Sequence, residues 1–281
     1  MIEKMLLSIK KLPPFPAAAR KVAELLRNDD YSVGEVANVI KYDQAIAANI
    51  LKICNSAYFG ARQRISSIPE AVIYLGQKQL LRAVETASAG RIFARGNPGY
   101  GIKPKDLWRH SVAVALMSQI LSRRIANKEN PVLYTAALLH DVGKLILGTF
   151  VEGSYRRITE VMAERACSFL EAEEEVLGIN HAELGGRIAV YWNFPAEIHD
   201  AIAFHHRPDL MAAGETTLAN LVYLADQFCL LMGIDGGCDQ LAHRGLEEVM
   251  KRYHIKEGDI EESILRLKEE IERAQELLEI A

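Results

Sequence analysis

Residues 137–147, which read A-L-L-H-D-V-G-K-L-I-L, constrain the fold of this chain more than any other stretch. Most of these residues are apolar or small and belong in a hydrophobic core, yet His140 and Asp141 stand in their middle. A buried carboxylate is costly unless a positive charge compensates it. A bound metal cation would do so, and Lys144 adds a positive charge one helical turn further along. The alternative is that His140 and Asp141 are a capped or salt-bridged pair near a helix end. A metal site requires that other parts of the chain supply further ligands.

The composition describes a globular chain and disfavours several classes of partner. Of the 281 residues, 49% are hydrophobic and 25% are charged, which is enough for a sizeable core and, at this length, for two compact units. The net charge of −4 and the scattered Lys and Arg residues disfavour nucleic-acid binding. No segment approaches the roughly 18 apolar residues of a membrane span, and the N-terminus fits no signal peptide. We therefore expect a cytoplasmic protein with no membrane partner.

The four cysteines lie far apart and form no C-x-x-C pair, so we expect buried free thiols rather than disulfides or a zinc finger.

Residues 1–95 read as a series of helices, because their apolar residues recur at helical spacing without the alternation of a strand. Ser32 opens a predicted capping box, and Asp43 is predicted to cap the helix that follows it. Asn55 is predicted to hold the end of that helix through backbone hydrogen bonds. Gly76 is a predicted helix C-cap.

The clearest break in the chain is residues 96–104, where three glycines and two prolines cannot extend a helix. Beyond it the sequence predicts helices over residues 106–125, 131 onward, 151–177, 181–192, 195–204 and 217–231. The acidic run at residues 171–175 is predicted to be a solvated face. A last amphipathic segment, residues 263–280, either packs on its own chain or pairs with a second copy as a short coiled coil in a homodimer.

Several histidines and acids interrupt the apolar helices of the C-terminal part. Each histidine taken alone is more simply a satisfied core residue, but together they indicate a shared metal site. Asp226, inside V-Y-L-A-D-Q-F-C, particularly requires a partner, because nothing near it in the sequence is cationic. The candidate ligands are His110, His140, Asp141, His181, His205, His206 and Asp226.

The N-terminal half resembles the HDOD family, a set of bacterial signal-transduction domains. The resemblance rests on Leu12-Pro13 with Pro16, on K-Y-D-Q-A-I-A-A-N-I-L-K-I-C-N-S-A-Y-F-G, on Ile65 with Ile68, and on A-V-I-Y-L-G. It continues to about residue 230. It implies an all-α, multi-helix bundle in which an N-terminal helical subdomain packs on an HD-like helical subdomain. It also implies a regulatory role with a protein partner in a signalling pathway.

The ligand pattern is similar to that of the HD superfamily of metal-dependent phosphohydrolases. His110, the His140-Asp141 pair and Asp226 match its metal-binding pattern. His181, His205 and His206 resemble the additional ligands of the two-metal HD-GYP type. Many HDOD domains have lost these ligands, whereas this sequence keeps the set. Asp106 either adds a ligand, as an acid does at this place in HD-GYP proteins, or caps its helix.

The resemblance implies one or two divalent transition-metal ions, with Fe, Mn, Zn or Ni all suited to such ligands. Cations sharing Asp141 would activate water for attack on the phosphorus of a phosphate-containing small molecule or nucleotide. Lys144 either holds a phosphate oxygen or is a surface lysine near a helix end. After His206 the chain reads R-P-D-L-M-A-A-G instead of the G-Y-P loop, which puts cyclic di-GMP hydrolysis in doubt.

We therefore place an N-terminal helical part at residues 1–95, a connecting loop at 96–106, an HD-like metal-binding subdomain at 107–235 and a C-terminal helical extension at 236–281. The function that follows is a regulatory HDOD protein with a mononuclear or dinuclear site and metal-dependent phosphohydrolase activity. The alternative is a non-catalytic module for protein interaction or ligand sensing, with a structural metal site. Asp141 and Lys144 would be the catalytic residues of the phosphohydrolase.

Overall fold

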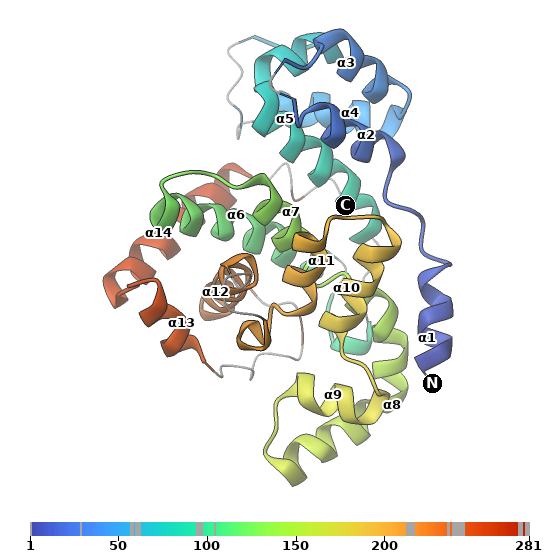
Figure 1. Ribbon diagram of the computed structural model, residues 1–281, viewed down its shortest axis with the longest axis vertical. Helices are drawn as coiled ribbons and strands as arrows, with labels where there is room; N and C mark the ends of the chain where they lie inside the picture. The colour runs from blue at the N-terminus through green and yellow to red at the C-terminus, as the bar shows by residue number, and fades with distance from the viewer. Residues whose placement is uncertain are drawn as a thin grey trace. The chain divides into compact units, whose positions relative to one another are not determined.

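The computed structural model (Figure 1) describes residues 2–28, 30–56, 59, 63–93, 98–103, 105–211, 217–234, 237, 245–274 and 278. In these ranges the chain forms helices joined by turns and contains no β-strand, so the predicted all-α fold is confirmed. The helices are α1 (Ile2–Ile9), α2 (Ala17–Leu25), α3 (Val33–Lys41), α4 (Gln44–Cys54), α5 (Ile68–Phe93), η1 (Pro98–Tyr100), α6 (Asp106–Ala126), α7 (Pro131–Leu139), α8 (Lys144–Arg165), α9 (Phe169–Leu177), α10 (His181–Tyr191), α11 (Ala196–Ala203), η2 (Pro208–Leu210), α12 (Thr217–Leu231), α13 (Leu246–Arg252) and α14 (Glu257–Arg273).

The chain divides into two compact units. The smaller unit contains Pro14–Ile92 together with Lys268–Ala281, and the larger unit contains Met1–Pro13 together with Phe93–Leu267. All the candidate ligands belong to the larger unit. Each unit is described by itself below.

Local signals set the helix ends of the smaller unit, as predicted. Ser32 forms one half of its predicted capping box by accepting a hydrogen bond from the Glu35 amide of α3, and Asp43 accepts one from the backbone of α4. The Asn55 side chain donates to the Ile65 carbonyl at 2.8 Å and accepts from the Ile65 amide at 2.9 Å. Gly76 interrupts α5 with φ of 63°, a conformation that glycine adopts at little cost.

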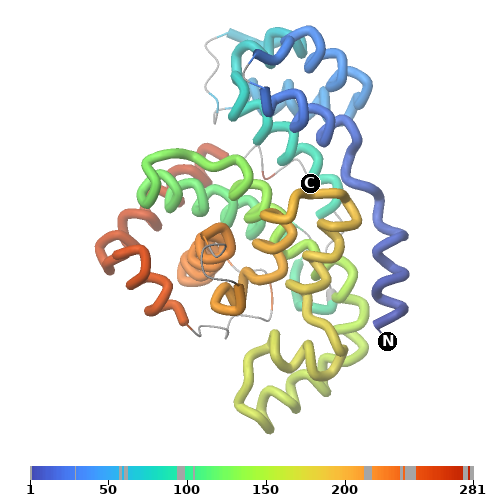
Figure 2. Tube along the Cα trace, viewed as in Figure 1, coloured from blue at the N-terminus to red at the C-terminus, as the bar shows by residue number. Residues whose placement is uncertain are grey.

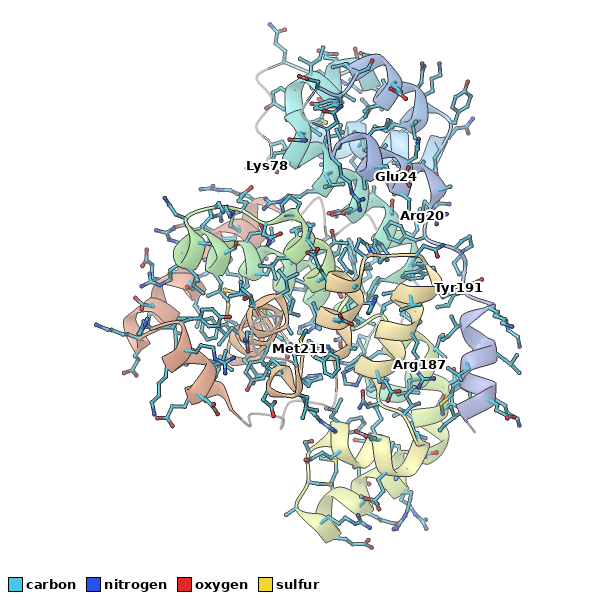
Figure 3. All side chains as sticks on the ribbon, in the orientation of Figure 1. Arg20, Glu24, Lys78, Arg187, Tyr191 and Met211 are labelled. Atoms are coloured by element: carbon cyan, nitrogen blue, oxygen red, sulfur yellow. The ribbon has the colours of Figure 1, made fainter. Side chains whose placement is uncertain are left out.

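The larger unit is built around α12 and α6, which are buried over most of their circumference. In Figure 1, α12 is seen nearly along its axis, and it contacts α6, α7, α11 and α13. Helices buried on all sides need apolar residues on all faces, which is the pattern that both sequences show. Figure 3 shows the side chains of these helices filling the space between the ribbons. His110 on α6 and Asp226 on α12 are therefore placed inside a core.

A helical hairpin of α8 and α9 extends the larger unit, and the Cα trace shows the chain turning back between the two helices (Figure 2). Ser168 begins α9 with a full capping box, since its side chain bonds the Glu171 amide while Glu171 bonds the Ser168 amide.

The first half of α14 packs on its own chain. Arg124 at the end of α6 pairs with Asp259 and Glu262, and Ser263 and Leu267 are buried. This contact supports packing in cis for the start of the predicted segment at residues 263–280, whose residues 275–277 and 279–280 lie outside the described part.

Among the described residues, Cys54, Cys167 and Cys229 are free thiols, whereas Cys238 lies outside the described ranges. None of the helices in the described part of the chain combines the length and apolar character that a membrane crossing requires.

Candidate metal centre

The His140-Asp141 pair lies on a tight turn between α7 and α8. Helix α7 ends at Leu139 and α8 begins at Lys144, so the residues do not belong to one continuous helix. The Val142 amide bonds the Leu139 carbonyl at 2.9 Å, and the Lys144 amide bonds the Asp141 carbonyl at 3.0 Å. The turn projects both side chains of the pair into the interior of the larger unit, where each is 1% exposed.

Gly143 allows this turn to press against the start of α10. A Cβ atom at Gly143 would lie 1.9 Å from the His181 carbonyl oxygen. Only glycine permits that approach without a shift of backbone. The close packing brings His181 toward Asp141.

A first cluster gathers beside one oxygen of Asp141. His110 Nε2 lies 3.2 Å from His140 Nε2 and 3.2 Å from Asp226 Oδ1. Asp141 Oδ2 lies 3.6 Å from His110 Nε2 and 3.4 Å from His140 Nε2. Three segments distant in sequence thus point donor atoms at one place. We call these four residues the first cluster: His110, His140, Asp141 and Asp226.

A second cluster gathers beside the other oxygen of Asp141. His181 Nε2 lies 2.9 Å from His206 Nε2. Asp141 Oδ1 lies 3.6 Å from His181 Nε2 and 3.9 Å from His205 Nε2. The second cluster, His181, His205 and His206, therefore shares Asp141 with the first.

Two atoms at the junction of the clusters are buried without a hydrogen-bond partner among the described residues. They are Asp141 Oδ1 and His205 Nε2. Buried polar atoms are ordinarily satisfied, and a carboxylate oxygen left alone in a core is costly. A cation between these two atoms would satisfy both, so the donor set fits a metal ion.

In four histidines, a hydrogen bond made by Nδ1 fixes the orientation of the imidazole and therefore the position of Nε2. Nδ1 donates to a backbone carbonyl in His110, His140 and His205, at 2.9, 2.7 and 2.7 Å. Nδ1 of His181 donates to Glu173 Oε2 at 2.8 Å. With the proton on Nδ1, the lone pair of a neutral imidazole stands on Nε2, as metal binding requires.

Glu173 belongs to the candidate site, and the sequence did not single it out. The acidic run 171–175 was predicted to be a solvated face, and this is wrong for Glu173, which is fully buried. Its carboxylate bonds both the amide and Nδ1 of His181 and accepts the hydroxyl of Tyr100. The available signal was its spacing, because Glu173 lies one helical turn from Phe169 and one from Leu177 on the apolar stripe of α9.

Lys144 is buried, so its interpretation as a surface lysine is wrong. Its Nζ lies 2.8 Å from Asp141 Oδ2 and 5.6 Å from the centre of the Tyr100 ring. Its position at the first residue of α8 also differs from the helix C-terminus where a cation compensates the dipole. Lys144 instead places its charge against the carboxylate that both clusters share.

Asp106, His199 and His254 belong to neither cluster. Asp106 is the first residue of α6, and the cap position belongs to Lys105. His199 bonds the neighbouring Asp200 at 2.7 Å. His254 is exposed after α13, and His243 lies outside the described residues.

Burial holds three of the histidines neutral. It lowers the pKa of His205 to about 3, and it also lowers the pKa values of His140 and His206. For His110, burial again opposes protonation, but the hydrogen bond and charge of Asp226 outweigh it and raise the pKa.

The carboxylates stay ionised although they are buried. Burial alone would raise the pKa of Asp141, but the charge of Lys144 and then of the histidines holds it well below its usual range. Burial alone would raise the pKa of Asp226, but the His110 hydrogen bond together with the charges of His110, His140 and His206 lowers it to about 2. Neutral imidazoles beside ionised carboxylates are the forms that bind divalent cations.

Comparisons with known proteins agree with this fold. A crystal structure of an HDOD domain protein of unknown function from Geobacter sulfurreducens superposes with a TM-score of 0.76 at 26% identity, covering 100% of this chain and 99% of that one. A provisionally assigned phosphohydrolase from Shewanella amazonensis superposes with a TM-score of 0.74 at 22% identity, covering 98% and 97%. The second likeness shows the fold alone.

Among curated proteins, an uncharacterised protein of Treponema pallidum is 26% identical over 201 residues. The match covers 70% of this chain, and the chain spans only 38% of the length of that relative. Residues 12–208 match the HDOD domain, which is most of the chain and includes every candidate ligand except Asp226. The chain belongs to the HDOD domain family.

Proposed function

We propose that this HDOD chain holds two divalent transition-metal ions and acts as a metal-dependent phosphohydrolase within a signalling pathway. The single observation that carries the proposal is the position of Asp141, whose Oδ2 faces the first cluster and whose Oδ1 faces the second. A carboxylate between two groups of imidazoles is the arrangement expected of a bridging ligand.

Each ion would have its own ligands besides Asp141. His110, His140 and Asp226 would hold one, and the second cluster would hold the other. Fe, Mn, Zn and Ni all suit such imidazole and carboxylate ligands. When bound, the ions would supply Lewis-acid activation of a phosphoryl oxygen and of water.

The chain's own residues would orient and hold the charges of that reaction. The carbonyls of Ile234, Ala137 and Ile202, and the Glu173 carboxylate, keep four imidazoles in the ligand tautomer. Lys144 would offset negative charge developing on a phosphate oxygen, because its ammonium is already at the shared carboxylate.

The substrate class that we propose is a small phosphomonoester or nucleotide. Cyclic di-GMP is disfavoured, because the sequence after His206 lacks the G-Y-P loop. Arg207, which follows it, is held by Glu174 at 2.6 Å. It is therefore not poised at the clusters as a phosphate ligand.

A second candidate, a non-catalytic sensing or interaction module with a structural metal site, is favoured by burial. The most exposed of the seven candidate ligands is His206, at 8%. A site so enclosed suits a metal that stabilises a fold as well as one that meets a substrate. The alternatives differ in whether hydrolysis accompanies metal binding.

The deciding experiment measures phosphate release. Wild-type protein loaded in turn with Mn²⁺, Fe²⁺, Zn²⁺ or Ni²⁺ would be given p-nitrophenyl phosphate and a panel of nucleotides, beside Asp141→Ala and Lys144→Met. We expect turnover in the wild type, none in Asp141→Ala and a loss of about 100-fold in Lys144→Met. Full metal loading without turnover on any substrate would support the non-catalytic module instead.

A further inference from the structure

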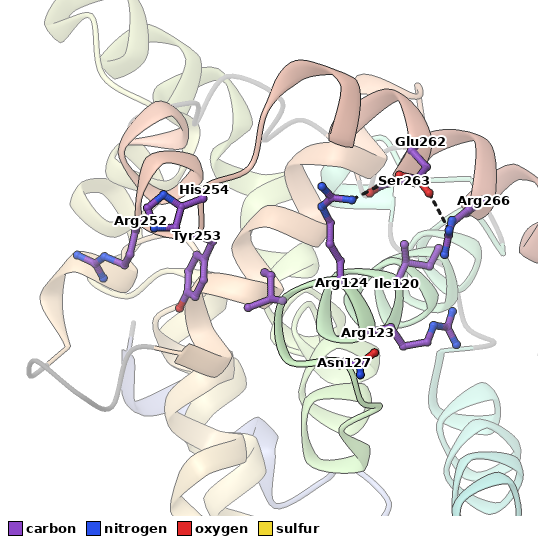
Figure 4. Close-up of a pocket in the computed structure, with 11 residues that line it drawn as sticks. Ile120, Arg123, Arg124, Asn127, Arg252, Tyr253, His254, Glu262, Ser263 and Arg266 are labelled. Atoms are coloured by element: carbon purple, nitrogen blue, oxygen red, sulfur yellow. Dashed lines mark hydrogen bonds and ion pairs between the residues drawn. The ribbon is translucent and has the colours of Figure 1, made fainter.

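A second polar site lies on the larger unit, in a groove of about 760 Å³ (Figure 4). Three segments line it: the end of α6, the turn after α13 and the first half of α14. Arg124, in the groove, is about 21 Å along α6 from His110 at 1.5 Å per residue. The groove is thus separate from the His/Asp clusters.

The lining of this groove is basic, although the chain carries a net charge of −4. One carboxylate, Glu262, lies among the lining residues. Arg123 and Arg124 also pair with Glu129 and Asp259, which are not lining residues of the groove. The cationic side chains at the groove are Arg123, Arg124, Arg252 and Arg266. A concentration of guanidinium groups opposite in sign to the whole chain indicates a place where anions are stabilised.

Two of these arginines converge on one anion position. Glu262 accepts hydrogen bonds from Arg124 Nη1 at 3.4 Å and from Arg266 Nη2 at 2.7 Å, and Figure 4 marks both bonds. The side chains of Glu262 and Arg266 are 48% and 59% exposed. A carboxylate held this loosely can give up its place to an anion from solution.

Compensation of helix dipoles explains only part of this arrangement. Arg123 and Arg124 stand in the last turn of α6, and Arg252 stands in the last turn of α13, where cations are favourable. Arg266 stands in the middle of α14 and yet faces the same groove. A shared anion would account for Arg124 and Arg266, the two arginines that both reach Glu262.

The size and chemistry of the groove suit a compact polyanion with a flat or apolar part. Volumes of roughly 300–1,000 Å³ are typical of small-molecule sites. The planar guanidinium fork matches phosphate oxygens in pairs. Tyr253, Ile120 and Ile125 add aromatic and apolar surface. We propose that the groove binds a small polyphosphate, free or carried by a nucleotide, with Arg124 and Arg266 on its phosphate groups in place of Glu262.

Calorimetric titration of the full chain at low salt, in the presence of a chelator, tests the proposal with inorganic tripolyphosphate and with ATP. We expect saturable binding that weakens about tenfold in Arg266→Gln, the loss of one charge-assisted contact. We expect tighter binding in Glu262→Gln, because the competing carboxylate is removed. Tighter binding of ATP than of tripolyphosphate would identify a nucleotide, and equal binding would identify the phosphates alone as the recognised part.

Arg187→Gln is the matched control. Arg187 pairs with Glu183 at 2.6 Å and i,i+4 spacing on α10 (Figure 3), as Arg266 pairs with Glu262 on α14. Its binding should equal that of the wild type. Since a damaged fold cannot strengthen binding, Glu262→Gln keeps the test decisive even if an arginine variant is unstable.

The proposal is overturned if neither probe binds saturably, or if Arg266→Gln and Arg187→Gln bind equally. It is also overturned if binding is lost in Asp141→Ala and kept in Arg266→Gln, which would assign the phosphates to the His/Asp clusters.

Discussion

The Nδ1–H group of His181 donates a hydrogen bond to Glu173 Oε2, 2.8 Å away, and both side chains are fully buried. The same carboxylate raises the pKa of His181, its charge and hydrogen bond outweighing the opposing effect of burial. Because Glu173 also accepts a hydrogen bond from the His181 amide, it holds both the backbone and the imidazole of the first residue of α10. The orientation of His181 in the second cluster therefore depends on an acid that is not one of the candidate ligands.

Replacing Glu173 with Gln should weaken metal binding without removing a ligand. The amide keeps the shape of the side chain but not its charge, and loss of such a partner typically costs about 10–100-fold in metal affinity. Competition with a chromogenic chelator measures the change. Glu175→Gln is the control, since Glu175 pairs with Arg165 at 2.6 Å away from the clusters. Equal affinities in the two variants would contradict the role given to Glu173.

Lys144→Met should destabilise the metal-free protein by about 3–5 kcal/mol, because it leaves the Asp141 carboxylate buried without its ammonium partner. Bound metal should reduce this loss, since cations would then compensate the carboxylate. Urea unfolding with and without chelator measures both values. Lys251→Met, which breaks an exposed pair with Glu247, should leave the urea midpoint nearly unchanged. A loss as large with metal as without it would argue against an ion at Asp141.

The metal-free protein should lose stability as the pH falls below about 6.5. His205, with a folded pKa of about 3 against 6.5, and Asp226, with about 2 against 3.8, bind fewer protons folded than unfolded in acid. Their contributions are present above the unfolded pKa and are lost as the pH falls through the folded one. His110 and His181 have raised pKa values and act in the opposite direction, favouring the fold below pH 6.5.

Urea midpoints of chelator-treated protein between about pH 7.5 and pH 4 measure this dependence. His205→Gln removes one of the depressed groups, so its midpoint should fall less steeply than that of the wild type. The same slope in both proteins would show that His205 is not buried in its neutral form.

Gly143→Ala should disrupt the turn between α7 and α8, because its Cβ would lie 1.9 Å from the His181 carbonyl oxygen. We expect a loss of about 1–3 kcal/mol or more in thermal unfolding, with weaker metal binding. Gly153→Ala is the matched control within α8, where a Cβ meets nothing within 4 Å. That change should stabilise by about 0.5–1 kcal/mol. Tolerance of Gly143→Ala would show that α10 can move away from the turn.

The sequence predicted those features whose causes are local. Ser32 and Asp43 cap helices by bonding amides three residues away, and the polar residues inside α6 and α12 stand out against apolar neighbours. The turn at residues 140–143 was not predicted, because apolar residues on both sides of it continue the pattern of a single helix. Glu173 was hidden among other acids.

The arginine groove had no signal in the sequence at all. Arg124, Arg252 and Arg266 come from three helices and meet only after folding. Each of these arginines alone reads as an ordinary surface residue, because charged residues are common on exposed helix faces. That they line one groove depends on how α13 and α14 pack on the end of α6, which local periodicity does not determine.

Elemental analysis of the protein purified without added metal or chelator tests the central claim, that Asp141 joins two metal sites. We expect about two equivalents of transition metal per chain, from the two groups of ligands that share Asp141. His206→Ala should retain about one equivalent, because only the second cluster is changed, and Asp141→Ala should retain none. A wild-type protein that contains no metal and takes up none when it is supplied would contradict the account.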